Sequence, residues 1–332
     1  MAELAGVSTA TVSHVINGTR NTLPETHDRV MAAVRELGYS LNQAARNLVV
    51  GHSSLLGLII SDMRNPFFPE VTAAFQEEAL SHQMDALVFS TSYDSQRTLA
   101  AVNRLVGLQV PGVAVVTSQI DPAVMELLAQ RKIAATYLDL GIVGPGVSNL
   151  AVDYEQGIRQ AIEHLLELGH REIGYVGGPP HLPSAMRRKA AFLEEASRAG
   201  LQPTAVVDGD FTVEGGYRAG TVLCEQSRRP TAVVAGNDLT AIGVLRCAQD
   251  HGIAVPAQLS VVGFDDIAFA EHTQPPLTTV ALPREHIGRI AFDSLWRMIK
   301  TGEAGSTYPI ETRLIQRGST ARVLTAVGAG AD

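Results

Sequence analysis

The hydrophobic pattern from residue 55 onward alternates short apolar runs with longer segments of helical periodicity. The apolar runs predict strands at Leu55–Ser61, Ala86–Ser90, Val113–Thr117, Ala134–Leu138, Leu150–Val152, Ile173–Val176, Ala205–Val207, Ala232–Ala235 and Ser260–Phe264. Nearly continuous apolar strands between helices are typical of parallel sheets covered on both faces, so the pattern predicts an α/β fold. The second half repeats the first, and a helix over Arg284–Lys300 with tail strands near Ile310–Ile315 completes two doubly wound lobes around a cleft.

The first fifty residues have a different, helical pattern. A first helix ends at Gly6, where a left-handed residue is needed. Ser8 is a good N-cap for a second helix, which stops at Asn17–Gly18. The small polar residues of the second helix lie on its outer side. Its inner face is formed by Val12, Val15 and Ile16.

A third helix is predicted over Pro24–Leu37, because proline suits the first helical position and Gly38 closes the helix. Its inner stripe consists of Val30, Ala33, Val34 and Leu37. Two helices joined by a glycine turn, with short polar side chains outside, are typical of a helix-turn-helix whose outer face enters the DNA major groove. An ordinary three-helix protein-interaction domain is the alternative from this pattern alone.

Two longer segments of this region have a more specific pattern than the helices alone. "GVSTATVSHVINGTR" and "AVRELGYSLNQAARNL" fall within residues 2–54, which resemble the headpiece and hinge helix of the lactose-repressor (LacI/GalR) family. The second helix is especially similar to that of purine-type repressors. The resemblance implies that Thr9, Ala10 and His14 read bases, and that Leu48 wedges into a central minor-groove step and bends the DNA. The phosphate-binding positions it implies are Ser8, Ser13, Asn17 and Thr19.

The remaining chain resembles the type I periplasmic sugar-binding fold that this family shares, through about Thr320. The match lies in "SDMRNPFFPE", "LGHREIGYVGG", "RRPTAVVAGNDLTAIGVL", "VPAQLSVVGFDD" and "PPLTTVALP". The expected domains are a helix-turn-helix headpiece over 1–40, a hinge helix and linker over 41–53, and an effector-binding core over 54–325. Lobe 1 is expected to hold about 54–153 and 283–305, and lobe 2 about 154–282 and 306–320.

Several side chains at the strand ends have the chemistry that a sugar needs. Carboxylates and amides pair with adjacent hydroxyls, arginine bridges vicinal oxygens, and aromatic rings stack on the sugar face. The resemblance assigns effector contacts to Phe67, Phe68, Asp139, Ser184, Arg188, Phe211, Asn237 and Asp265. Three of these have other interpretations: Asp265 bridges the hinge, Asn237 caps a helix, or Phe68 belongs to the core.

Composition narrows the class of protein. The net charge is −8, and residues 1–50 hold four arginines against four acidic residues, a net charge of zero, which predicts weak nonspecific DNA affinity. Cys224 and Cys247 lie far apart in the sequence, and the histidines do not cluster there with other potential metal ligands. This argues against a disulfide framework, a zinc site or a catalytic nucleophile. We expect no cofactor, no metal, no signal peptide and no membrane span, and hence a cytoplasmic protein.

One departure from the family concerns the start of the chain. The family normally has several residues before Ala2, and Met1 stands where the family often has valine, so we expect a truncated first helix. The sequence as a whole predicts a homodimeric, allosteric repressor that binds a near-palindromic DNA operator and a small effector, a sugar or a related metabolite. The alternatives are a solute-binding protein, or a member defective in DNA binding that only senses its ligand. A sugar- or nucleoside-processing enzyme lacks a catalytic constellation.

Overall fold

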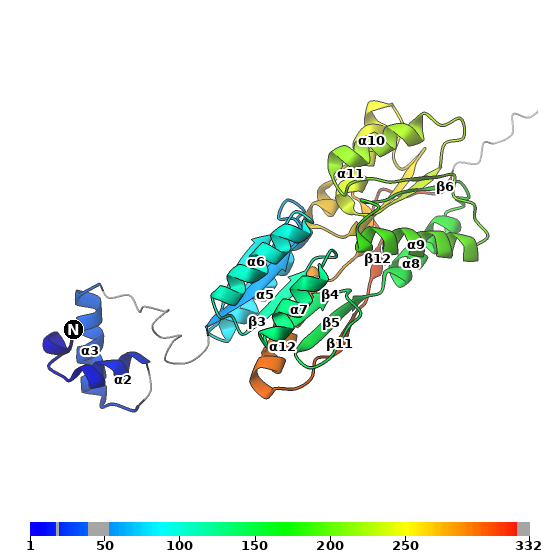
Figure 1. The fold of residues 1–332 in the computed structure, drawn as a ribbon. Coiled ribbons are helices and arrows are strands. Elements are labelled where there is room, and N and C mark those ends of the chain that lie inside the picture. The colour runs from blue at the N-terminus through cyan, green and yellow to red at the C-terminus, as the bar shows by residue number, and fades with distance from the viewer. Residues whose placement is uncertain (18–19, 39–52, 324–332) are drawn as a thin grey trace, which may run out of the picture. The chain divides into compact units, whose positions relative to one another are not determined.

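The computed structural model describes residues 1–17, 20–38 and 53–323. The chain divides into two compact units, Met1–Ser54 and Leu55–Asp332, and each is described by itself (Figure 1). In the part of the chain that is described, no helix has the length and apolar character needed to cross a bilayer.

The first unit is a small three-helix domain. It contains α1 (Ala2–Ala5), α2 (Thr9–Asn17) and α3 (Pro24–Glu36). The predicted left-handed turn at Gly6 is confirmed by its φ of 62°, and the predicted cap of α2 is confirmed because the Thr11 amide donates to Ser8 Oγ at 3.1 Å. Its core consists of Ala5, Val15, Val30 and Ala33.

One predicted core position of this unit is wrong. Leu37 was expected on the inner stripe of α3, but it is the C-cap residue and is 53 % exposed. The helix ends at Glu36 and Gly38 takes a left-handed φ of 56°, so the chain turns away before Leu37 reaches the buried face.

The first sheet of the second unit has six strands in the order β11-β5-β4-β3-β1-β2, all parallel. The strands are β1 (Leu55–Ile60), β2 (Asp85–Ser90), β3 (Gly112–Val116), β4 (Ala134–Leu138), β5 (Val147–Val152) and β11 (Thr307–Ile310). Alternate residues of β1 serve opposite faces, because Leu58 and Ile60 pack in one core cluster and Ile59 in another. The sheet is therefore buried on both sides, as predicted.

The second sheet also has six strands, in the order β12-β10-β9-β8-β6-β7, with β12 antiparallel to β10. Its strands are β6 (Ile173–Val176), β7 (Ala205–Val207), β8 (Ala232–Ala235), β9 (Ser260–Asp265), β10 (Thr278–Ala281) and β12 (Arg313–Ile315). The sequence did not predict β10. This strand begins with two threonines, so it lacks the continuous apolar run that marked the others.

Helices cover both sheets (Figure 1). They are α5 (Phe67–Ser81), α6 (Ser95–Gly107), α7 (Pro122–Gln130), α8 (Tyr154–Glu167), α9 (Pro183–Arg198), α10 (Val213–Cys224), α11 (Asp238–Asp250) and α12 (Arg284–Thr301), with a 3₁₀ turn, η1 (Ala268–His272). The closest helix pairs are α10 on α11, α12 on α5 and α8 on α9. The predicted α/β class with two doubly wound sheets is confirmed.

The chain passes between the two sheets three times: from β5 to α8, from β10 to α12, and from β11 to β12. The expected assignment of all of 306–320 to the second lobe is wrong for β11. This strand pairs with β5 of the first sheet, and only β12 joins the second sheet. β11 ends at Ile310, which is buried in the core. β12 begins at Arg313, so the last crossing lies between residues 310 and 313.

Candidate functional site

A cavity lies where the carboxyl ends of strands from both sheets face one another, as expected for doubly wound sheets. It is lined by Ser61, Asn65, Phe67, Phe68, Tyr93, Val116, Thr117, Ser118, Leu138, Tyr154, Ser184, Arg188, Phe211, Asn237, Asp265 and Leu282. Seven of the eight residues expected to contact an effector are among them; the exception is Asp139. The structure thus brings side chains that are distant in the sequence together in one small site; Phe67 and Asp265, for example, are about 200 positions apart.

Arg188 is the central charged group of this cavity. It lies on α9 and is 7 % exposed. One guanidinium nitrogen donates to the Gly236 carbonyl at 2.5 Å, and another donates to the Asp265 carboxylate at 3.0 Å. Its Nε is buried and has no hydrogen-bond partner in the structure. An acceptor oxygen of a bound molecule would satisfy this donor, because an unpaired buried N–H is costly.

Burial and ion pairing have opposite effects on the pKa of Arg188 and on the pKa of Asp265. Burial has the largest single effect and would lower the pKa of Arg188, but the Asp265 carboxylate and the nearby tyrosines Tyr154, Tyr175 and Tyr93 together outweigh it, so the pKa is raised. Burial raises the pKa of Asp265, while Arg188 and a hydrogen bond from Asn65 oppose that rise. The Asp265 backbone has a φ of 108°, a strained conformation for a residue with a side chain. The strain places the carboxylate at the cavity wall, beside the arginine.

Aromatic rings surround the guanidinium. The Arg188 Cζ lies 4.1 Å from the centre of the Phe264 ring, 5.4 Å from that of Tyr154 and 5.6 Å from that of Phe211. These distances are within the range of cation–π attraction. The cavity therefore combines one fixed ion pair with flat apolar walls. Such a site suits a polar ring compound with both a hydrogen-bonding edge and an apolar face.

Asp139 does not line the cavity. Its carboxylate accepts hydrogen bonds from the Tyr154 hydroxyl at 2.6 Å and the Val152 amide at 2.8 Å. Arg187 of α9 also lies 3.4 Å from it and donates to the Asp139 carbonyl at 2.7 Å. The left-handed φ of 58° at Asp139 turns the side chain toward Tyr154 and away from the cavity. In this structure Asp139 positions Tyr154, which itself lines the site.

Asn237 and Ser184 line the cavity, but each already has a partner. The Asn237 side chain accepts from the Thr240 amide at 2.9 Å and donates to the Phe211 carbonyl at 3.1 Å, so it caps α11. Ser184 Oγ donates to Ser118 Oγ at 3.1 Å. The alternative interpretation of Asn237 as a helix cap is thus confirmed, and one of its amide hydrogens is still available to a ligand.

Phe67 and Phe68 also belong to the hydrophobic core, with exposed fractions of 4 % and 6 %. Their rings meet edge to face at 5.1 Å at the start of α5. Phe68 therefore belongs to the core, as one interpretation held, and it also lines the cavity, because the core extends as far as the cavity wall.

Sequence reasoning missed Tyr93 and Tyr154 and gave no role of its own to Asn65. Tyr93 follows β2 with a left-handed φ of 61°, and it packs with Leu182, Ala185 and Phe211. Tyr154 begins α8 and is buried, with a pKa raised well above its usual value chiefly by that burial. A tyrosine directly after a strand end was the only signal available, and that signal is weak without knowledge of the fold.

The cavity is small. Its volume is about 40 Å³, and about 10–15 Å³ of such space is needed for one water molecule, so it holds only a few waters. Several ties between the two lobes keep it small, among them Ser118 to Ser184, Asp139 to Arg187 and Tyr154, and Asn65 to Asp265. A sugar-sized molecule would therefore have to separate the two lobes, and the ties are the contacts that such a movement would break first.

In the first unit, the expected DNA-contacting residues lie on or beside α2. Ser8, Thr9, Ala10 and Ser13 are exposed and His14 is half-buried. Ser8 Oγ accepts from the Thr11 amide, so part of its hydrogen-bonding capacity serves the helix. The side chain of Asn17, and all of Thr19 and Leu48, lie outside the described residues.

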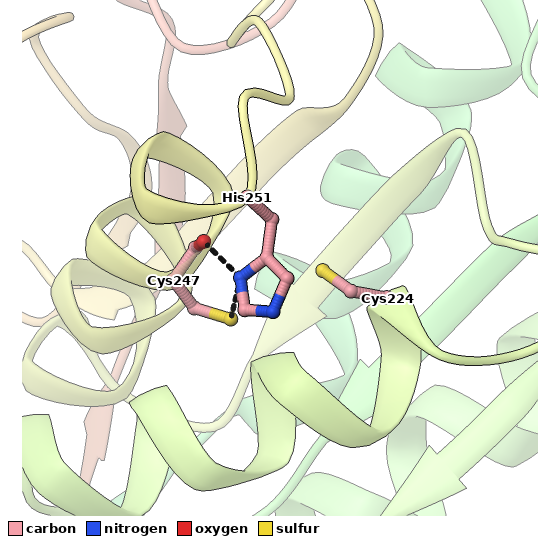
Figure 2. Close-up of side chains that lie close together, drawn as sticks. All are labelled: Cys224, Cys247 and His251. Atoms are coloured by element: carbon pink, nitrogen blue, oxygen red, sulfur yellow. Dashed lines mark hydrogen bonds between the residues drawn. The ribbon is translucent and has the colours of Figure 1, made fainter.

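The structure overturns the expectation that the cysteines are isolated. Cys224, Cys247 and His251 lie together, with one donor atom of each within 4.8 Å of the others (Figure 2). The packing of α10 on α11 brings Cys224 to Cys247 across 22 intervening residues. The same packing places His251 beside two cysteines, which are potential metal ligands, although the sequence showed no such cluster.

Comparison with known proteins agrees with this arrangement. Residues 1–42 match the family of bacterial regulatory proteins called lacI, and residues 162–320 match the periplasmic binding protein-like domain. The HTH-type transcriptional repressor PurR of Proteus mirabilis is 35 % identical over 326 residues, which cover 97 % of this chain and 96 % of that protein.

Solved structures give the same result. The lac repressor dimer bound to operator and the anti-inducer ONPF superimposes with a TM-score of 0.86 at 27 % identity, covering 96 % of this chain and 97 % of that one. The complex of the transcriptional regulator CelR with cellobiose gives a TM-score of 0.72 at 29 % identity, covering 96 % and 98 %. From its sequence and its fold alike, this chain belongs to the lacI family of bacterial regulatory proteins.

Proposed function

We propose that this chain is a transcriptional repressor whose affinity for operator DNA changes when a small effector binds between the two lobes of its second unit. One observation carries the proposal: a helix-turn-helix unit and a ligand cavity with a buried, incompletely satisfied arginine occur in the same chain. The related proteins support it, because two are repressors and two were solved with small ligands. A solute-binding protein without DNA affinity is not favoured, since the lacI match covers the helix-turn-helix.

The chemistry of the cavity supports an effector with a polar edge and a flat face, a sugar or a related ring metabolite. Arg188 Nε supplies an unpaired donor, Asn237 supplies a free amide hydrogen, and Asp265 supplies acceptor oxygens. Phe67, Phe68 and Phe211 supply the apolar wall. Ser184 and Asp139 act differently in this proposal, because they hold the closed lobes together through Ser118 and Arg187, and these contacts break on opening.

On the DNA side, we propose that Thr9, Ala10 and His14 contact bases. Ser8, Ser13, Asn17 and Thr19 contact phosphates in this scheme. Short side chains on the exposed face of α2 allow close approach to base edges, and the hydroxyl and amide groups around it suit phosphate oxygens. Leu48 would insert between base pairs, an assignment that rests on the sequence resemblance alone.

We further propose a homodimer on a near-palindromic operator, because two copies related by a twofold axis match two half-sites. We propose that the chain acts in the cytoplasm, because bacterial operator DNA lies there. The family is one of regulators, so we propose no catalytic reaction for the cavity and no cofactor.

The test of DNA binding is selection of a duplex sequence from a random pool by the full chain, followed by fluorescence anisotropy with the selected operator at fixed salt. We expect a near-palindromic operator and a loss of affinity in Leu48→Ala of at least about tenfold, or 1.4 kcal/mol, because the wedge acts only on bent DNA. The matched control is Leu80→Ala, which removes a leucine that is 71 % exposed in the second unit. Failure to enrich any sequence would contradict the proposed function.

A further inference from the structure

Outside the ligand cavity, the ends of α10 and α11 hold a group of side chains with no role in the proposed repressor mechanism. We propose that Cys224, Cys247 and His251 form a binding site for a thiophilic divalent cation, Zn²⁺. The three donor atoms lie within 4.8 Å of one another (Figure 2). Two sulfurs and an imidazole nitrogen are ligands that zinc prefers, whereas Mg²⁺ and Ca²⁺ prefer oxygen.

The distances require little adjustment. With zinc–sulfur bonds near 2.3 Å and zinc–nitrogen bonds near 2.0 Å, the donors of a tetrahedral site lie about 3.5–3.8 Å apart. In the structure, one donor atom of each residue lies within 4.8 Å of the others, about 1 Å beyond that range. The imidazole ring lies between the two cysteines (Figure 2). Binding a cation therefore requires the donor atoms to move together by about 1 Å.

The histidine is also held as a ligand should be. His251 Nδ1 lies 2.8 Å from the Cys247 carbonyl, four residues earlier in the chain. A ring that donates its Nδ1 hydrogen to this carbonyl has its lone pair on Nε2. Metal-bound histidines commonly donate their other ring hydrogen to a backbone carbonyl, which fixes the tautomer and the ring orientation.

The helix packing builds the pair of thiols. A Cβ atom at Gly220 would lie 2.9 Å from Cys247 Cβ, so only glycine lets α10 approach α11 this closely. Cys224 follows Gly220 by about one helical turn and so lies on the same face. The Thr221 hydroxyl lies 3.6 Å from Cys247 Sγ and could donate to a thiolate there. The site is buried at Cys247 and exposed at His251, so a cation and a fourth ligand, a water molecule, have access from the solvent.

The experiment uses the full chain, reduced with a phosphine and freed of metal with a chelator. Zn²⁺ is titrated in competition with a chromophoric chelator, and Co²⁺ serves as a spectroscopic substitute. We expect one Zn²⁺ per chain and a thiolate-to-cobalt charge-transfer absorption. Cys224→Ser and His251→Gln should each weaken binding at least about 100-fold, because even partners outside the coordination shell change metal affinity 10–100-fold.

His272→Gln is the matched control, since this exposed histidine lies outside the cluster and pairs with Glu271. It should bind zinc as the unmodified chain does. His251 is exposed, so His251→Gln should fold even if a cysteine variant does not. Zinc affinity unchanged in His251→Gln, a cobalt spectrum without thiolate absorption, no zinc binding by the reduced chain, or a Cys224–Cys247 disulfide in chain purified without oxidant would each overturn the proposal.

Discussion

Arg188 shows how one residue can serve both the fold and the ligand. Besides lining the cavity, it stabilises the folded chain, because the guanidinium is the partner of a buried carboxylate, Asp265, and of the Gly236 carbonyl. Removing one partner of a buried pair leaves an uncompensated charge.

We therefore expect Arg188→Met to lower the free energy of unfolding by about 3–5 kcal/mol. Adding Asp265→Asn removes the stranded charge, so the double variant should recover much of this loss. Urea unfolding of the single and double variants, with Asp265→Asn alone as the control, measures the coupling. Equal stability of Arg188→Met and the double variant would show that Asp265 does not depend on the arginine.

Asp238 provides a pH test of the same region. Its carboxyl accepts from the Thr279 hydroxyl at 2.5 Å and from the Ile267 amide at 2.8 Å. Burial raises the pKa of Asp238 well above its ordinary 3.8, and the nearby Asp265 charge adds to the rise. The folded state thus holds this proton more tightly than the unfolded chain does. Its contribution to stability is complete below about pH 4 and is lost as the pH rises through the folded value.

Asp238→Asn has no proton to lose, so its stability relative to the unmodified chain should increase as the pH rises from 4 to 7. Chemical unfolding of both proteins at several pH values checks this, because the other carboxyl groups are common to the two and cancel. Parallel stability curves across this range would mean that Asp238 titrates as an ordinary aspartate.

At the residue scale, the sequence indicated the chemistry of the cavity but not the direction of each side chain. Arg188 and Asp265 were predictable because they lie in recognisable segments at strand ends. Asp139 was not, since a left-handed backbone turns its carboxylate toward Tyr154. The zinc-ligand cluster was not predictable either, because its three members meet only through the contact between two helices.

At the scale of elements, the packing of α10 on α11, the most extensive among the described helices, depends on glycine. A Cβ atom at Gly216 of α10 would lie 2.2 Å from the Thr240 carbonyl oxygen of α11. Real Cβ atoms do not approach backbone so closely, so the two helices would have to separate. Strand positions were largely predictable from apolar runs, whereas this approach depends on tertiary packing.

Gly216→Ala should therefore lower the unfolding free energy by about 1–3 kcal/mol through overpacking. Gly107→Ala is the matched control: it lies in α6, a Cβ atom there would meet nothing within 4 Å, and alanine should stabilise the helix by roughly 0.5–1 kcal/mol. Thermal unfolding of both variants shows the contrast. A Gly216→Ala protein as stable as Gly107→Ala would mean that α10 and α11 are not packed as described.

At the scale of the whole second unit, three chain crossings and several side-chain ties join the two sheets around a cavity of about 40 Å³. The sequence predicted two lobes with a cleft but not that the cleft is closed, because closure depends on side-chain contacts between distant segments. An effector that separates the lobes has a differential affinity for open and closed forms, which is the physical requirement for allostery.

Operator binding with and without effector tests this account most directly. Sugars, nucleosides and nucleobases are first screened for those that raise the melting temperature of the full chain. The selected operator is then titrated at fixed salt, with and without a saturating amount of the stabilising compound. We predict that the compound changes the operator dissociation constant by about 5- to 150-fold, the usual range of allosteric coupling. Identical operator affinity in both titrations would contradict the coupling between the cavity and the helix-turn-helix.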